Sequence, residues 1–179
     1  IMFAGIGLAL GVYERPFWPG LGWGFVYASL VALIPLIVIV YLIRTGHIGE
    51  LHMSNTHERH IPYLTSVISG TVAFLILTFF DGPELLRCLA ILSVITLGAL
   101  GLINTKLLLR IHATAAAATW MIATVVFGWM AGAILQPFMI LISAIRLYLK
   151  RHTPAQVLAG LALGISTVLA MRAFGCFVP

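Results

Sequence analysis

The sequence predicts an all-α fold, a polytopic transmembrane bundle of six to seven helices. Of its 179 residues, 61% are apolar or aromatic and only 8% are charged, whereas soluble domains average ~45–50% and ~25%. So few charges cannot cover a water-facing surface, which excludes a secreted disulfide scaffold, a nucleic-acid-binding domain, a disordered tail and a conventional cytosolic enzyme. The apolar runs are continuous and rich in Leu, Ala and Gly rather than alternating, which excludes a membrane barrel.

The apolar runs follow one another along a single transmembrane domain, residues 1–179. A spanning helix needs ~20 mostly apolar residues. The opening segment lacks the basic flank of a signal peptide, so we expect a partial N-terminal helix there, ahead of a six-helix core over about residues 20–178. Residues 111–145 are uncharged and too long for one span, so we expect a break around 132–137. The predicted core spans are 24–43, 61–80, 88–105, the two halves of 111–145, and 155–171 extended toward Val178.

Alternating these spans from side to side separates the loops into two faces. One face, which we call the histidine face, receives loops 44–60, 104–112 and 146–154, with all six histidines and seven of the ten cationic residues. The histidines are His47, His52, His57, His60, His112 and His152, and the cations are Arg44, Arg59, Lys106, Arg110, Arg146, Lys150 and Arg151. The other face holds Arg15, Arg87 and Arg172.

The predicted spans make the chain an integral membrane protein, and we expect it in a bacterial inner membrane. The positive-inside rule would make the histidine face cytoplasmic. Cations gathered to bind an anion would give the same distribution, so the sidedness of this face stays open.

The residue types on the histidine face favour phosphate chemistry. Arginine binds phosphate oxygens in a bidentate fork, and histidine can attack phosphorus or transfer protons near neutral pH. The loops lack the magnesium-binding carboxylates of a kinase-like site. They therefore predict metal-independent phosphoryl transfer, with no cofactor and no metal site.

The third of these loops resembles the third signature of the type 2 phosphatidic acid phosphatase (PAP2) superfamily, which includes the vanadium haloperoxidases. That signature is Arg, five residues, His, three residues, Asp. Arg146 and His152 have the first spacing, and Gln156 stands at the position of the Asp. The following AQVLAGLALG also looks like membrane-bound members of the family.

The other two loops are similar to the first and second signatures in part. His112 stands where catalytic members have the His of Pro-Ser-Gly-His, but the three preceding residues differ. Arg59 and Pro62 fall in the region of the first signature, Lys, six residues, Arg-Pro, with His52 in place of the Lys. Two predicted spans separate each loop from the next, as in the family, and the resemblance covers roughly residues 20–178.

The resemblance implies a role for each of these residues. His152 would be the nucleophile that forms a phosphohistidine, and His112 the general acid. Arg146 and Arg59 would bind the phosphoryl oxygens, and Lys106 or Arg110 would replace the missing lysine. Gln156 would hydrogen-bond the nucleophilic imidazole without supplying the charge of the family's Asp.

These departures leave two functions open. The first is a lipid-phosphate or isoprenoid-pyrophosphate phosphatase, whose partners are membrane lipids and a lipid phosphate substrate. The second is a catalytically degenerate accessory subunit of a larger respiratory or photosynthetic membrane complex, whose partners are other membrane subunits. Neither function involves nucleic acid, and the sequence leaves open whether the chain turns over a substrate.

The histidines also allow two other interpretations. His47, His52, His57 and His60 lie within fourteen residues, a density that invites a zinc or haem site. No cysteine lies among them and Glu58 is the only carboxylate between His52 and His60, so solvated histidines at the membrane interface are the simpler interpretation. His112, at the start of a predicted span, could alternatively ligate the magnesium of a pigment.

Overall fold

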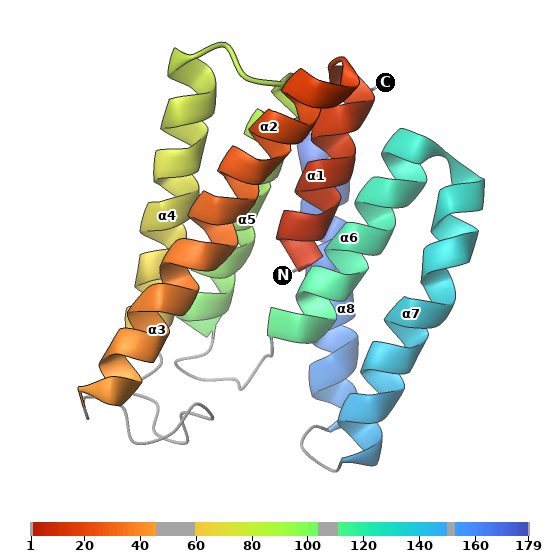
Figure 1. Ribbon diagram of the computed structural model, residues 1–179. Coiled ribbons are helices and arrows are strands. Elements are labelled where there is room, and N and C mark those ends of the chain that lie inside the picture. The colour runs from red at the N-terminus through yellow and green to blue at the C-terminus, as the bar shows by residue number, and fades with distance from the viewer. Residues whose placement is uncertain (1, 46–59, 104–110, 150–152, 179) are drawn as a thin grey trace. The chain divides into compact units, whose positions relative to one another are not determined.

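Helix is the regular structure throughout the described part of the chain. The computed structural model describes residues 2–45, 60–103, 111–149 and 153–178 (Figure 1). These residues form helices α1 to α8 and no strand, which confirms the predicted all-α class. Among them, three helices are long and apolar enough to cross a membrane: Phe17–Arg44, Glu84–Ile103 and Pro154–Ala173. The chain divides into two compact units, Phe3–Thr105 and Lys106–Pro179.

The first unit contains the helices from α1 to α5. Their bounds are α1 Met2–Glu14, α2 Phe17–Ala28, α3 Ile34–Arg44, α4 His60–Phe79 and α5 Glu84–Ile103. A π-helical turn, η1 (Ser29–Leu33), joins α2 to α3, so that residues 17–44 form one continuous helix. Helices α4 and α5 pack along each other, and η1 and α3 pack against α4. The predicted spans 61–80 and 88–105 correspond to α4 and α5.

Glycines allow α1 and α2 to pack backbone against backbone. A Cβ atom at Gly11 would overlap the carbonyl oxygen of Gly20, and one at Gly24 would lie 2.8 Å from the Cα of Leu8. Gly7 makes room for the ring of Tyr27, which is fully buried. The Tyr27 hydroxyl lies 2.9 Å from Ser93 Oγ in α5, so α2 is anchored on both sides.

The second unit is a three-helix bundle of α6 (Ile111–Phe127), α7 (Trp129–Tyr148) and α8 (Pro154–Ala173). The predicted division of residues 111–145 into two helices is correct, but its predicted place, around 132–137, is wrong. The break is at Gly128, whose φ of 90° is readily adopted only by glycine. Pro137 lies inside α7.

Gly132, at the start of the predicted break, packs α7 on α6 instead of ending a helix. A Cβ atom there would lie 3.1 Å from Thr124 Cβ, and the Trp120 indole N–H donates to the Gly132 carbonyl oxygen at 2.9 Å. Proline is tolerated within an apolar helix where neighbouring groups satisfy the backbone. Proline at position 137 is therefore a poorer sign of a helix end than a glycine with positive φ.

Helices α6 and α8 run parallel and in close contact. A Cβ atom at Gly160 would lie 3.2 Å from Ala113 Cβ, and one at Gly164 would overlap the Thr114 carbonyl oxygen and lie 3.0 Å from Ala117 Cβ. This is the close approach that small residues four apart permit between apolar helices. The glycines therefore fix the register of α8 along α6.

We predict that Gly164→Ala destabilises the protein, because the added methyl group has no space between α6 and α8. The expected loss is about 1–3 kcal/mol in the free energy of unfolding, the usual cost of overpacking. Unfolding by SDS in mixed micelles, followed by circular dichroism, measures it. The matched control is Gly98→Ala in α5, where a Cβ atom meets nothing within 4 Å. Equal effects of the two substitutions would contradict the described α6–α8 packing.

Candidate functional site

The seven predicted site residues are covered unevenly by the structure. Four of them, Arg59, Lys106, Arg110 and His152, lie outside the described residues. The other three lie at helix ends of the second unit. His112 is the second residue of α6, Arg146 lies in the last turns of α7, and Gln156 lies in the first turn of α8. The contacts predicted among the seven stay predictions.

One end of the second unit gathers these three helix ends. Because α6 and α8 are parallel and α7 runs in the opposite direction along α6, the start of α6, the end of α7 and the start of α8 lie at the same end (Figure 1). Gly160 lies beside Ala113, the third residue of α6, so Pro154, six residues before Gly160, extends about 6 Å beyond the start of α6 at 1.5 Å per residue. This arrangement agrees with the placement of loops 104–112 and 146–154 on one face.

The helical register places Arg146 on the side of α7 that faces α6. Gly132 contacts α6, and the half-buried Leu135, Met139 and Ile142 follow it at intervals of three and four residues. Arg146 is the next position of this row. Pro137 and Ala144 lie on the opposite side of α7, in an open groove.

His112 and its neighbours lie in contrasting environments. The His112 side chain is exposed, whereas Ala113 and Thr114 are buried against Gly160 of α8. Packing of the alanine-rich helix on α8 thus fixes the backbone next to His112. The imidazole itself is accessible, as a proton donor to a bound substrate has to be.

Gln156 has a structural role that the sequence reasoning missed. The Thr153 side-chain oxygen accepts a hydrogen bond from the Gln156 backbone N–H at 3.3 Å, and Gln156 Oε1 accepts one from the Thr153 backbone N–H at 3.2 Å. This reciprocal pair is a capping box, and its signal, Thr or Ser followed three residues later by Gln or Glu, was present in the sequence. Orientation of the His152 imidazole by Gln156 stays a prediction.

The capping box limits what Gln156 can offer an imidazole. Its carbonyl oxygen accepts the Thr153 backbone N–H, which holds the side chain over the helix N-terminus, and a neutral amide supplies no negative charge. The family's Asp instead accepts a hydrogen bond from the imidazole N–H and stabilises the imidazolium cation. Gln156 in this conformation therefore cannot reproduce the chemistry of the Asp.

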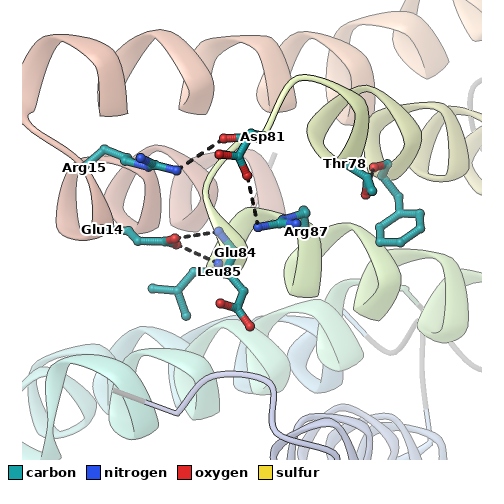
Figure 2. Close-up of polar contacts among 8 residues, drawn as sticks. Glu14, Arg15, Thr78, Asp81, Glu84, Leu85 and Arg87 are labelled. Atoms are coloured by element: carbon teal, nitrogen blue, oxygen red, sulfur yellow. Dashed lines mark hydrogen bonds and ion pairs between the residues drawn. The ribbon is translucent and has the colours of Figure 1, made fainter.

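The described ionic and polar contacts concentrate at one end of the first unit (Figure 2). The Glu14 carboxylate accepts hydrogen bonds from the backbone N–H groups of Glu84 at 2.6 Å and Leu85 at 2.7 Å, which are the first residues of α5. The Arg15 guanidinium donates to the Asp81 carbonyl oxygen at 3.2 Å. These contacts join the α1–α2 turn to the α4–α5 turn, two loops that the sequence placed on the same face.

This cluster is a structural junction rather than a candidate for catalysis. Arg87 Nη2 lies 3.9 Å from Asp81 Oδ1, and Asp81 adopts a positive φ of 52° in the turn before α5. The sequence analysis did not identify Glu14, the carboxylate that caps α5, because Glu14 lies 70 residues away in the chain.

Metal binding has no candidate group among the described residues, which contain no cluster of three or more His, Cys, Asp or Glu side chains placed to hold an ion. His47, His52 and His57, on which the zinc interpretation depends, lie outside the residues that the structure describes. The zinc interpretation therefore stays a sequence-based alternative.

Comparison with known proteins adds no relative. No protein-family model, no curated protein and no solved structure matches the chain. The resemblance to the PAP2 superfamily rests on the motif residues themselves.

We predict that Glu14→Gln destabilises the first unit, because a neutral amide replaces a carboxylate that accepts two backbone N–H groups. The expected loss is about 1–2 kcal/mol, the range of a helix N-cap. SDS unfolding again measures it. Glu84→Gln is the matched control, since it removes one negative charge at the same helix end and leaves the Glu14 carboxylate in place. Indistinguishable losses for the two variants would show that charge alone, and not the paired hydrogen bonds, accounts for the effect.

Proposed function

We propose that the chain is an integral membrane protein of the PAP2 type, with six to seven spans, which hydrolyses a lipid phosphate or an isoprenoid pyrophosphate through a histidine nucleophile. We place it in a bacterial inner membrane. The observation that carries the proposal is the pair Arg146 and His152 at the spacing of the family's third signature, with His112 in the preceding loop.

The arrangement of the second unit supports this proposal. The first turns of α6 and α8 and the last turn of α7 lie at one end. Helices α6 and α7 carry His112 and Arg146, and His152 stands in the sequence between α7 and α8. Position 146 continues the row of α7 residues that begins at Gly132, and the His112 side chain is exposed.

The proposed reaction has two steps. A ring nitrogen of His152 attacks phosphorus, the bond from phosphorus to the leaving oxygen breaks, and His112 donates a proton to that oxygen. Water then attacks the phosphohistidine with His112 as the base, which releases phosphate and restores both imidazoles. Arg146, with Arg59 from the first motif, would stabilise the charge on the phosphoryl oxygens, and Lys106 or Arg110 would add a further cation.

The second candidate function is a PAP2-type bundle without catalysis, an accessory subunit of a larger membrane complex. The glutamine at position 156 favours it, because a neutral amide engaged in a helix cap does not supply the charge of the family's Asp. In the catalytic triads of hydrolases, replacing the Asp by a residue that leaves the imidazole in the wrong tautomer lowers the rate by ~10⁴. Under this alternative the surviving cations would bind lipid phosphate without turnover.

The test is release of phosphate from phosphatidic acid and from an isoprenoid pyrophosphate by the purified protein, with EDTA present. We expect release by the wild-type protein, its loss in His152→Ala, and a decrease of ~10²–10⁴ in kcat for His112→Ala. His57→Ala, a histidine of the same face outside the motifs, serves as the control and should retain activity. A wild-type protein that is folded and inactive would contradict the proposal and favour the accessory subunit.

Gln156→Asp tests the missing acid directly. An aspartate at this position can accept the imidazole N–H and stabilise its cation, and we expect kcat to rise at least ~10-fold. The capping interaction provides the control on folding, because Asp is also favourable near a helix N-terminus. An unchanged or lower kcat in a variant of wild-type stability would show that position 156 does not contact the nucleophile.

A further inference from the structure

The helix formed by residues 17–44 changes its hydrogen-bond register at η1. The Ile34 backbone N–H donates to the Ser29 carbonyl oxygen, five residues back, instead of to Leu30 as in an α-helix. The donor that the π register would offer Leu30 is residue 35, which is proline and has no N–H. The Leu30 carbonyl therefore loses both of its possible backbone partners within the helix.

Ser69 of α4 supplies the missing donor. Its side-chain hydroxyl donates to the Leu30 carbonyl oxygen across the helix interface, and the serine is buried, with 4% of its surface exposed. An unpaired carbonyl in an apolar environment costs several kcal/mol. The hydrogen bond from Ser69 is thus the interaction that makes the π register acceptable at this position.

The two sides of η1 are held very differently. On the α2 side, Tyr27 is fully buried and bonded to Ser93, and three glycine contacts fix the helix against α1. On the α3 side, Pro35 is the one buried residue of the helix. Figure 1 shows α2 and α3 as a continuous ribbon, with α3 leading away from the better packed half. Helix α3 could therefore turn about its axis while α2 stays in place.

If η1 took an α-helical register instead, the number of backbone hydrogen bonds would be similar to that of the π register. Ile34 N–H would then donate to Leu30, and the unpaired carbonyl would be that of Val31, whose α-helical partner is Pro35. The Ser69 hydroxyl could turn back to a carbonyl of its own helix, as serine commonly does. Each state leaves one carbonyl for a side chain to satisfy, and in the structure it is the π state that Ser69 satisfies.

We propose that η1 is a rotational pivot for α3 and that Ser69 is the latch that holds α3 in the orientation of the structure. Conversion of η1 from π to α register advances α3 by one residue, about 100° of rotation and 1.5 Å of translation. Ile39, now half-buried, would take the exposed position of Val40, and Tyr41, now exposed, would take the half-buried position of Leu42. The pivot is independent of the proposed enzymatic activity.

Spin labels on single introduced cysteines test the rotation. Labels at Ile39→Cys and Tyr41→Cys are compared in liposomes by their collision rate with oxygen, which is concentrated in the bilayer interior, with labelling of the parent chain subtracted. With Ser69 present, we expect the label at position 41 to be the more accessible. In Ser69→Ala we expect the difference between the two labels to shrink, because the π register has lost the donor for Leu30 and with it its advantage over the α register.

Two further variants complete the experiment. Pro35→Ala gives residue 35 an N–H that can donate to Val31 in the α register or to Leu30 in the π register. Because both registers are then satisfied, we expect the commoner α register to prevail and the order of the two labels to reverse. This variant alters no donor on α4 and remains informative if Ser69→Ala does not fold. Thr71→Ala removes a hydroxyl of α4 that bonds to Val67 of its own helix, and it should leave both accessibilities unchanged. Accessibilities of both labels that are unchanged in folded Ser69→Ala, or in folded Pro35→Ala where Ser69→Ala does not fold, would overturn the pivot.

Discussion

A backbone polar group in an apolar environment has to find its partner within the protein, and this constraint explains the main features of the described structure. Helix interiors meet it unaided, but helix ends and irregular turns do not. At two such points a side chain from elsewhere in the chain completes the hydrogen bonding. The Ser69 hydroxyl donates to the Leu30 carbonyl, and the Glu14 carboxylate accepts the first N–H groups of α5.

The same constraint favours close contact between helix backbones. Glycines bring α1 against α2 and α6 against α8, and these contacts fix the register along each pair. Register in turn determines which residues meet at the helix ends, where polar groups can reach water. In the second unit the register brings the start of α6 and the start of α8 to one end. Packing at Gly160 and Gly164 therefore positions the backbone of His112 in α6 and of Thr153 at the start of α8. The candidate site thus depends on residues that take no part in its chemistry.

The sequence predicted the helical class and most helix positions well, because continuous apolar runs are a strong signal. It predicted the wrong break between α6 and α7, because the conformation of Gly128 depends on how α7 packs on α6 and not on local composition. The π turn at Ser29–Leu33 was not predicted, because the partner of its Leu30 carbonyl, Ser69, lies 39 residues away in the chain. Long-range partners of this kind leave no pattern in the local sequence.

The candidate site, like the fold, was predicted where local sequence decides and missed where side-chain geometry decides. Motif spacing selected its residues, and the common end of α6, α7 and α8 follows from counting spans. The capping role of Gln156 could have been found from the sequence, since Thr153 precedes it by three residues. How the imidazoles and guanidinium groups face one another is a question of side-chain geometry, which spacing does not encode.

The most direct test of the proposed chemistry is to trap the covalent intermediate. The protein is mixed with a lipid phosphate labelled with ³²P, quenched in alkali within milliseconds, and digested for peptide mapping, because a phosphohistidine survives alkali and is lost in acid. The account predicts acid-labile label on the peptide that contains His152. Turnover of substrate with no label there, or with acid-stable label on a different residue, would contradict it.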